Sequence, residues 1–157
     1  MRRVSLRAAT LLFLSQISVA CATDTEQLEV PAPDAHVFEL QVYPILLRDC
    51  GFPACHGSRT RFFRIYGPGR TRKDESTPLF APATAQELEH SYARTRSMLA
   101  HEGDLTEALL LCKPLARSAG GGGHKGTDNW GNNVYLRRDD PSYALLFSWA
   151  ASAVDQP

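Results

Sequence analysis

The chain has 157 residues, in which 17 lysines and arginines are balanced by 17 aspartates and glutamates. This length suits one domain with a modest hydrophobic core. The balanced charge gives no indication of a nucleic-acid partner, because proteins that bind nucleic acid concentrate positive charge. The sequence also shows no nucleophile–base pair, phosphate loop or constellation of carboxylates, so it does not predict an enzyme such as a hydrolase or a transferase.

Residues 1–20 are predicted to be a secretory signal peptide. Arg2, Arg3 and Arg7 form a positive segment, and the apolar run that follows is too short to cross a membrane. Removal of these arginines leaves an excess of acidic residues in the mature chain. We therefore expect an exported protein, in a compartment where cysteine oxidation is permitted.

The signal peptide ends in S-V-A-C (Ser18 to Cys21), which is similar to a bacterial lipobox. We expect Cys21 to be acylated and to form the mature N-terminus; secretion without an anchor is the alternative. Residues 21–33 would then be a polar tether that carries the domain on the periplasmic side of the envelope. Ala22 replaces the aspartate of lipoproteins kept at the inner membrane, which favours the outer membrane.

Residues 34–157 are predicted to form one mainly α-helical domain with long loops. Asp34 is a predicted N-cap, and the apolar residues from Phe38 to Leu46 recur at helical spacing. Pro44 lies within this pattern, where it should kink the helix or mark the first turn of a second one. We favour a kinked helix that leads directly to Cys50.

The helix is followed by C-G-F-P-A-C-H-G, from Cys50 to Gly57. In C-x2-C-H motifs two thiols form thioethers with the vinyl groups of haem, and the histidine becomes the proximal iron ligand. Here four residues separate the cysteines, and Gly51 and Pro53 suit a loop that bulges between them. The alternative is a Cys50–Cys55 disulfide with His56 as an ordinary loop histidine.

The next segment, 59–73, is rich in arginine. A short run from Phe62 to Tyr66 is predicted to be extended and to end at Gly67-Pro68-Gly69. One or two of its cations are expected to pair with haem propionates, because arginine binds carboxylates in a bidentate manner. A solvated basic face is the alternative for most of them: Arg59, Arg61, Arg64, Arg70, Arg72 and Lys73.

Two capping boxes predict the next helices. Thr84 and Glu87 form the first, opening a helix that we expect to end near His101. The second, Asp104 with Glu107, should open a helix that runs to Cys112 and is ended by Pro114. A glycine-rich segment, 119–126, then interrupts regular structure.

Asp140 followed by Pro141 is a strong signal for the start of the last helix. Its predicted buried side contains Leu145, Leu146, Trp149 and Ala153.

The order of these motifs resembles the planctomycete-type cytochrome c domain, and the likeness to related myxobacterial lipoproteins is closer still. It rests on F-x3-V-x-P-I-L-x3-C…C-H-G (38–57), L-L-x-K-P-L (110–115), a glycine-rich loop with histidine, and D-P-S-Y-A-L-L-F-S-W-A (140–150). The resemblance implies a small cytochrome c-like fold, with its last helix packed across the first. It also implies that Cys50 and Cys55 form thioethers with one covalent haem c, with His56 as proximal ligand.

Several residues are candidates for the second axial ligand, since both thioether and imidazole bind haem iron. We favour His124, because its glycine-rich loop is free to approach a ligand. Met98 is the alternative, and a five-coordinate iron is a further one. His90 and His101 are interpreted as surface residues.

Two functions follow from the sequence. The first is an exported, lipid-anchored, monohaem cytochrome that passes electrons to an unidentified redox partner. The second is a haem-free lipoprotein with a Cys50–Cys55 disulfide, acting as a structural or binding module. Cys112 is interpreted as a buried apolar residue; a zinc site that combines it with Cys50, Cys55 and His56 is chemically possible.

Overall fold

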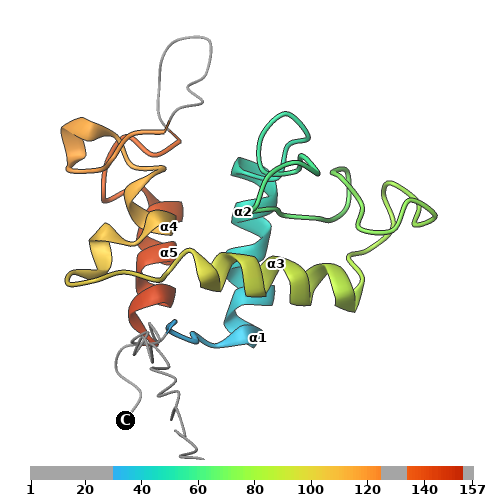
Figure 1. Ribbon diagram of the computed structural model, residues 1–157, viewed down its shortest axis with the longest axis horizontal. Coiled ribbons are helices and arrows are strands. Elements are labelled where there is room, and N and C mark those ends of the chain that lie inside the picture. The colour runs from blue at the N-terminus through green and yellow to red at the C-terminus, as the bar shows by residue number, and fades with distance from the viewer. Residues whose placement is uncertain (1–29, 125–133, 154–157) are drawn as a thin grey trace, which may run out of the picture.

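The computed structural model describes residues 30–124 and 134–153, and this part of the chain is mainly helical (Figure 1). Within these ranges there is no β-strand, and the one isolated bridge joins Leu115 to Tyr135. The predicted helical class is therefore confirmed. The predicted extended run from Phe62 to Tyr66 lies in irregular structure, because it pairs with no second strand.

The first helical column contains three consecutive segments: α1 (Ala35–Val37), the π-helical turn η1 (Phe38–Val42) and α2 (Tyr43–Asp49). Asp34 caps its start by accepting a hydrogen bond from the amide of Val37. Pro44 lies in the first turn of α2. This is the alternative that the sequence left open, and it corrects the kinked helix that we favoured. A proline ring clashes with the carbonyl group four residues earlier in an α-helix, and the wider π-turn removes this clash.

The last helix, α5 (Pro141–Ala151), packs against this column as expected. The rings of Phe38 and Trp149 have centroids 5.5 Å apart, and both side chains are buried. Trp149 also donates a hydrogen bond of 2.9 Å from Nε1 to the carbonyl oxygen of Asp34. Asp140 caps α5 by accepting hydrogen bonds from the amides of Ser142 and Tyr143.

Helix α3 (Ala85–Ser97) crosses this pair of columns (Figure 1). Its predicted capping box is confirmed, since Thr84 and Glu87 exchange hydrogen bonds with each other's backbone amides. The helix ends at Ser97 and does not reach the region of His101, which corrects the predicted end. The chain turns here because Leu99 is fully buried and the Met98 carbonyl accepts from the amide of Leu110.

The second predicted helix start is also corrected. Asp104 bonds to the amide and hydroxyl of Thr106 and caps only the short 3₁₀ turn η2 (Leu105–Glu107). The extended backbone of Ala108, which is fully buried, separates η2 from α4 (Leu109–Cys112). A further 3₁₀ turn, η3 (Arg117–Ala119), precedes the glycine-rich loop.

The long loop before α3 is held by a buried ion pair that the sequence did not reveal. Arg72 donates to both carboxylate oxygens of Glu87 and to four carbonyl groups, those of Pro78, Leu79, Ala81 and Pro82. Glu87 accepts two further hydrogen bonds from the amides of Lys73 and Thr84. Every polar group of the pair is thus bonded, which is the condition for burying two charges.

The end of the predicted tether is bound to α3. Arg96 donates to the carbonyl oxygens of Val30 and Pro31, and Tyr92 donates to that of Pro33. The predicted signal peptide, Cys21 and the remainder of the tether lie outside the described residues. In the part of the chain that the structure describes, no helix has the length and apolar character needed to cross a membrane.

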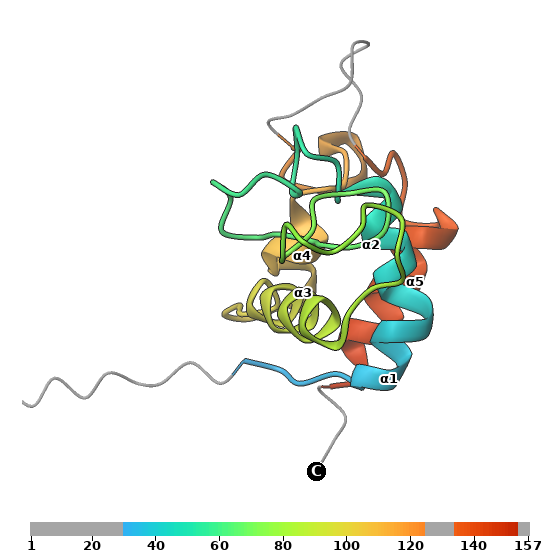
Figure 2. The same cartoon turned by 90° about the vertical axis from the view of Figure 1, so that its right-hand side faces the viewer.

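Figure 2 shows that α1 and the described chain that leads into it lie at one end of the molecule. The loops that follow α2 and α4 lie at the opposite end. The predicted haem motif and the glycine-rich segment belong to these loops, so the fold brings the two candidate regions to the same end.

Candidate functional site

The loop from Cys50 to Gly57 folds back on the end of α2. Cys50 is the C-cap of that helix, and its carbonyl oxygen accepts a hydrogen bond of 3.0 Å from the amide of His56. The amides of Cys55 and Gly57 both donate to the carbonyl oxygen of Phe52. Cys50 is partly buried and Cys55 is exposed. Local hydrogen bonds therefore close the loop and fix His56 directly beside α2.

Gly57 is required by this closure. A Cβ atom there would lie 2.4 Å from the carbonyl oxygen of Gly51 and 2.9 Å from that of Phe52. Both are backbone atoms that cannot rotate away, so a side chain would force the loop open. The close packing of this loop thus explains why a glycine follows His56.

The His56 ring is oriented by a carbonyl group. Its Nδ1 atom lies 3.1 Å from the carbonyl oxygen of Phe63. Because a carbonyl oxygen only accepts, this contact places the proton on Nδ1 and leaves the lone pair on Nε2. A backbone carbonyl on one ring nitrogen is the usual means of fixing an imidazole that binds a metal through the other.

The electrostatic surroundings keep His56 neutral. Burial lowers the pKa of His56, and the nearby His124 and Arg61 lower it further, although the bond to Phe63 opposes the shift. A lowered pKa keeps the imidazole unprotonated near pH 7. The neutral form is the one that binds a metal.

The glycine-rich loop is pinned to the end of α4. The amides of Gly121, Gly122 and Gly123 donate to the carbonyl oxygens of Ala116, Cys112 and Leu115 in turn. A Cβ atom at Gly121 would lie 2.1 Å from the Leu115 carbonyl oxygen, so only glycine allows this approach. The glycines therefore set the position from which His124 extends.

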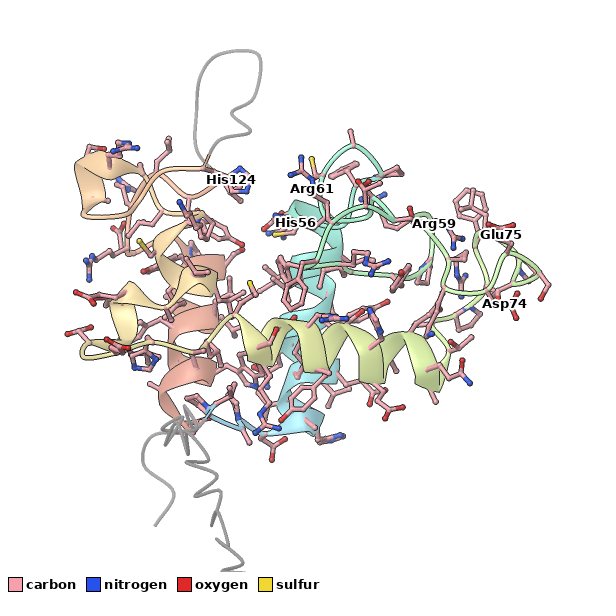
Figure 3. The ribbon with its side chains drawn as sticks, viewed as in Figure 1. His56, Arg59, Arg61, Asp74, Glu75 and His124 are labelled. Atoms are coloured by element: carbon pink, nitrogen blue, oxygen red, sulfur yellow. The ribbon has the colours of Figure 1, made fainter. Side chains whose placement is uncertain are left out.

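His124 and His56 are brought together from these two loops. Their ring centroids are 5.7 Å apart with an angle of 78° between the ring planes. Figure 3 shows the two side chains on facing loops, with Arg61 next to His56. The sequence indicated each histidine separately, and the fold places them side by side.

The other predicted ligands occupy different surroundings. Met98 caps the end of α3 and packs against the core. The His90 ring packs on Tyr66, with centroids 5.2 Å apart, and His101 Nδ1 contacts the Leu99 carbonyl oxygen at 2.6 Å. Among the described contacts, His124 is the one candidate that adjoins His56.

The three described cysteines, Cys50, Cys55 and Cys112, are free thiols in the structure. Burial raises the pKa of Cys50 to about 12, and the adjacent Asp49 adds to this effect, so this thiol is protonated at neutral pH. Cys112 Sγ lies beneath Gly122, 2.9 Å from the position of a Cβ there. Within the described ranges, no three histidine, cysteine or carboxylate side chains form a metal-binding group, so the zinc alternative finds no support there.

Most of the cations that follow the motif already have partners. Arg72 is buried in an ion pair with Glu87. Arg70 donates to the Leu47 carbonyl oxygen, and its guanidinium group lies over the ring of Phe52, 4.0 Å from the centroid. Arg64 donates to the Arg59 carbonyl oxygen and to the Tyr66 hydroxyl. Arg59 contacts the Arg72 carbonyl and Glu75. Arg61 is exposed and lies near His56. Among the cations that the sequence offered as partners of a haem propionate, it is therefore the candidate at this site.

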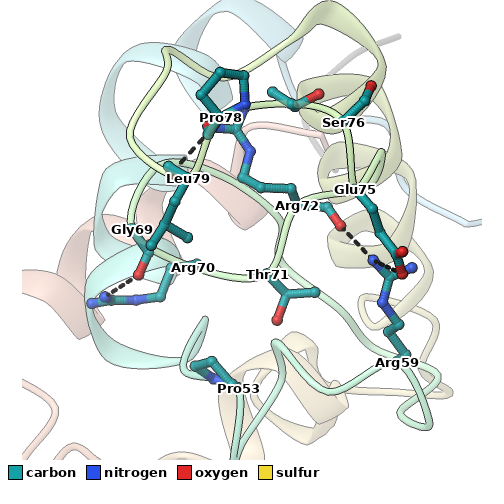
Figure 4. Close-up of a pocket in the computed structure, with 11 residues that line it drawn as sticks. Pro53, Arg59, Gly69, Arg70, Thr71, Arg72, Glu75, Ser76, Pro78 and Leu79 are labelled. Carbon is teal, nitrogen blue, oxygen red and sulfur yellow. Dashed lines mark hydrogen bonds and ion pairs between the residues drawn. The ribbon is translucent and has the colours of Figure 1, made fainter.

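An open pocket of about 600 Å³ lies elsewhere, between the motif loop and the loop before α3 (Figure 4). Its wall includes Pro53, Arg59, Arg70 and Leu79, and it contains neither His56 nor His124. The guanidinium groups that line it are engaged with carbonyl groups or with Glu75. It is therefore distinct from the paired histidines.

Comparisons with models of known protein families, with curated proteins and with solved structures gave no match for this chain. The resemblance to the cytochrome c domain consequently stays a prediction from the order of its motifs.

Proposed function

We propose that this chain is a cytochrome c-like protein that binds one haem covalently and transfers electrons. The observation that carries the proposal is the state of His56: partly buried, with a lowered pKa, and oriented by Phe63 so that the lone pair lies on Nε2, the atom that would bind iron. Two thiols of the same closed loop precede it. This is the donor set that covalent haem attachment requires.

His124 supports the same proposal as a second axial ligand. The two imidazoles are neighbours, with ring centroids 5.7 Å apart, and imidazole is one of the side chains that bind haem iron. Arg61 would neutralise an acidic propionate beside His56. Bound haem would supply a reversible one-electron couple.

We further propose that the protein is exported and anchored through Cys21 on the periplasmic side of a bacterial envelope, with the outer membrane preferred. The basic start of the sequence, the short apolar run and the S-V-A-C motif support this. Residues 30–33 are bound to α3 at the end of the molecule opposite the loops that carry the two histidines (Figure 2). The anchor would therefore not obstruct the site.

The second candidate function is a haem-free lipoprotein in which Cys50 and Cys55 form a disulfide. The observation that favours it is the edge-to-face packing of the His56 and His124 rings, which is a preferred geometry for two rings in direct contact. In this case the loop would serve as a structural or binding module.

A spectrum of the full chain separates the two functions. The chain is expressed in a bacterium with working haem-attachment machinery, purified, denatured and examined as the pyridine haemochrome. We expect covalent haem in the natural protein, loss of it with Cys50→Ser and Cys55→Ser together, and retention with the control Cys112→Ser. A colourless protein whose mass rises by about two daltons on reduction would replace the cytochrome proposal with the disulfide one.

A further inference from the structure

The open pocket shown in Figure 4 lies apart from the paired histidines and has a wall of mixed character. Pro53 and Arg59 form one part of this wall, and residues 69–72 and 75–79 form the rest. Its volume of about 600 Å³ is within the range of about 300–1,000 Å³ that is typical of sites for small molecules. Such sites combine apolar side chains with a few polar groups that orient the ligand.

One side of the pocket holds an exchangeable carboxylate. Arg59 Nη2 lies 3.2 Å from Glu75 Oε1, and the two side chains are 49% and 85% exposed (Figure 4). An ion pair as exposed as this one contributes little to stability. The same Arg59 nitrogen donates to the carbonyl oxygen of Arg72, which holds the guanidinium group at the pocket. An incoming carboxylate can therefore replace that of Glu75 on Arg59 at little cost.

A second guanidinium group, that of Arg70, lies on the other side of the pocket in Figure 4. Arg70 donates from Nε to the Leu47 carbonyl oxygen and from Nη1 to the Gly69 carbonyl oxygen. It also lies over the ring of Phe52, 4.0 Å from the centroid. These partners are neutral, so they fix the guanidinium group without cancelling its charge. An anion that enters the pocket therefore meets two guanidinium groups.

Exposed apolar side chains gather beside Gly69 and Arg70. Phe52, Leu79 and Phe80 are between 46% and 79% exposed. Phe52 lies against Arg70. The amide of Gly69 donates to the Leu79 carbonyl oxygen at 2.8 Å, and the Phe80 ring comes within 3.6 Å of the position of a Cβ at Gly69. Single exposed apolar residues are common, whereas neighbouring ones mark a surface that binds an apolar group. We name Phe52, Leu79 and Phe80 the apolar rim.

We propose that this pocket binds a small organic acid. Its carboxylate bonds to Arg59 in place of Glu75, and its aromatic or aliphatic body lies against the apolar rim. A carboxylate is favoured among anions because Arg59 already holds one, and arginine forms charge-assisted hydrogen bonds with carboxylates. The site contains neither His56 nor His124, so its occupation does not depend on haem.

The test uses phenylpropanoate as the probe, because it has one carboxylate and one ring. It is titrated into the isotope-labelled full chain, and the backbone amide signals are followed by NMR. Two matched compounds each lack one half of the probe: phenylpropanol has no charge, and propanoate has no ring. We expect the amide signals of Gly69, Thr71 and Leu79 to shift with a dissociation constant on the order of 1 mM, as for a ligand of this size. Both matched compounds should bind at least about tenfold more weakly.

Two pairs of variants test the exchange of carboxylates. Arg59→Gln should weaken binding of the probe at least about tenfold. Glu75→Gln should strengthen it about two- to fivefold, because a competing carboxylate is removed from an exposed ion pair. Arg137→Gln and Asp139→Asn are the matched controls, since their ion pair is also exposed, has a similar distance of 3.1 Å and lies outside the pocket wall. Each control should change binding by less than about twofold.

The opposite signs expected for the two pocket variants distinguish binding from damage to the loop, which would weaken binding in both. Equal binding by Arg59→Gln and the natural protein, or weaker binding by Glu75→Gln, would overturn the proposal. Equal binding of phenylpropanoate and phenylpropanol would also overturn it, because the pocket would then select the apolar group alone. The absence of any shift at Gly69, Thr71 and Leu79, even at high probe concentration, would do the same.

Discussion

Arg72 donates from Nε and Nη2 to the two carboxylate oxygens of Glu87, at 2.9 and 2.7 Å. Only 6% of Arg72 and 1% of Glu87 is exposed, so this is an ion pair inside the domain. It joins the loop that follows the segment from Cys50 to Gly57 to the start of α3. The position of the motif loop therefore depends on a charge pair as well as on apolar packing.

The first prediction concerns acid stability. Burial alone would raise the pKa of Glu87, but hydrogen bonds from Arg72 and from the amides of Thr84 and Lys73 hold it at about 2, below the usual 4.5. The ionised Glu87 carboxylate stabilises the folded state fully above the pKa that Glu87 has in the unfolded chain. This stabilisation is lost as the pH falls from about 5 to 2. A shift of this size corresponds to about 3 kcal/mol of unfolding free energy.

Urea unfolding between pH 6 and pH 2.5 measures this loss. Glu87→Gln removes the titrating group, and its unfolding free energy should vary less across this window. The exposed carboxylates titrate in both proteins, so the difference between the two curves isolates Glu87. Parallel curves would contradict the assignment.

The second prediction concerns the contact between the first and last helices. Trp149 is 3% exposed, packs on Phe38, and donates to Asp34. Trp149→Ala should cost about 3–5 kcal/mol of unfolding free energy. Phe80→Ala is the control, because Phe80 is 79% exposed and should change stability by less than about 0.5 kcal/mol. A loss below about 1 kcal/mol for Trp149→Ala would mean that this contact is not part of the core.

The third prediction concerns iron ligation. If haem is attached, His56→Ala should leave it covalently bound through Cys50 and Cys55 but convert its absorption spectrum to a high-spin or unstable form. His124→Ala should remove the low-spin spectrum while the haem stays attached. An unchanged spectrum in His124→Ala, followed by a change in Met98→Ala, would transfer the role of distal ligand to Met98.

The fourth prediction concerns the glycine-rich loop. Gly121→Ala places a methyl group against the Leu115 carbonyl oxygen, so the loop must move away from α4. We expect a loss of about 1–3 kcal/mol, as for other overpacked positions, and a weakened low-spin spectrum as His124 is displaced. Ser118→Ala, an exposed change in the adjacent turn, should alter neither property. Normal stability and spectrum in Gly121→Ala would show that the loop does not position His124.

The fifth prediction concerns the N-terminus. Cleavage before Cys21 and acylation of its thiol should give an intact mass that matches a lipid-modified chain starting at that residue. The protein should then enter the membrane fraction, whereas Cys21→Ser should be secreted in soluble form or retained unprocessed. An unmodified N-terminus at any other residue would exclude the anchor.

Local sequence determined those features that depend on neighbouring residues. Asp34, Thr84 with Glu87, and Asp140 with Pro141 specify helix starts, because a capping side chain bonds to amides two or three residues further on. The apolar spacing that includes Phe38 and Trp149 likewise identified the faces that meet in the core. The motif of Cys50, Cys55 and His56 was recognisable for the same reason, since its members are close in the chain.

Only the tertiary structure decided the features that join distant segments. The sequence alone could not show that Arg72 is buried with Glu87, that α3 ends at Ser97, or that Phe63 orients His56. The approach of His124 to His56 belongs to this group, because it depends on how closely the glycine amides pack against the end of α4. Capping and periodicity act over a few residues, whereas a charge pair or a shared site requires the whole chain to close around its core.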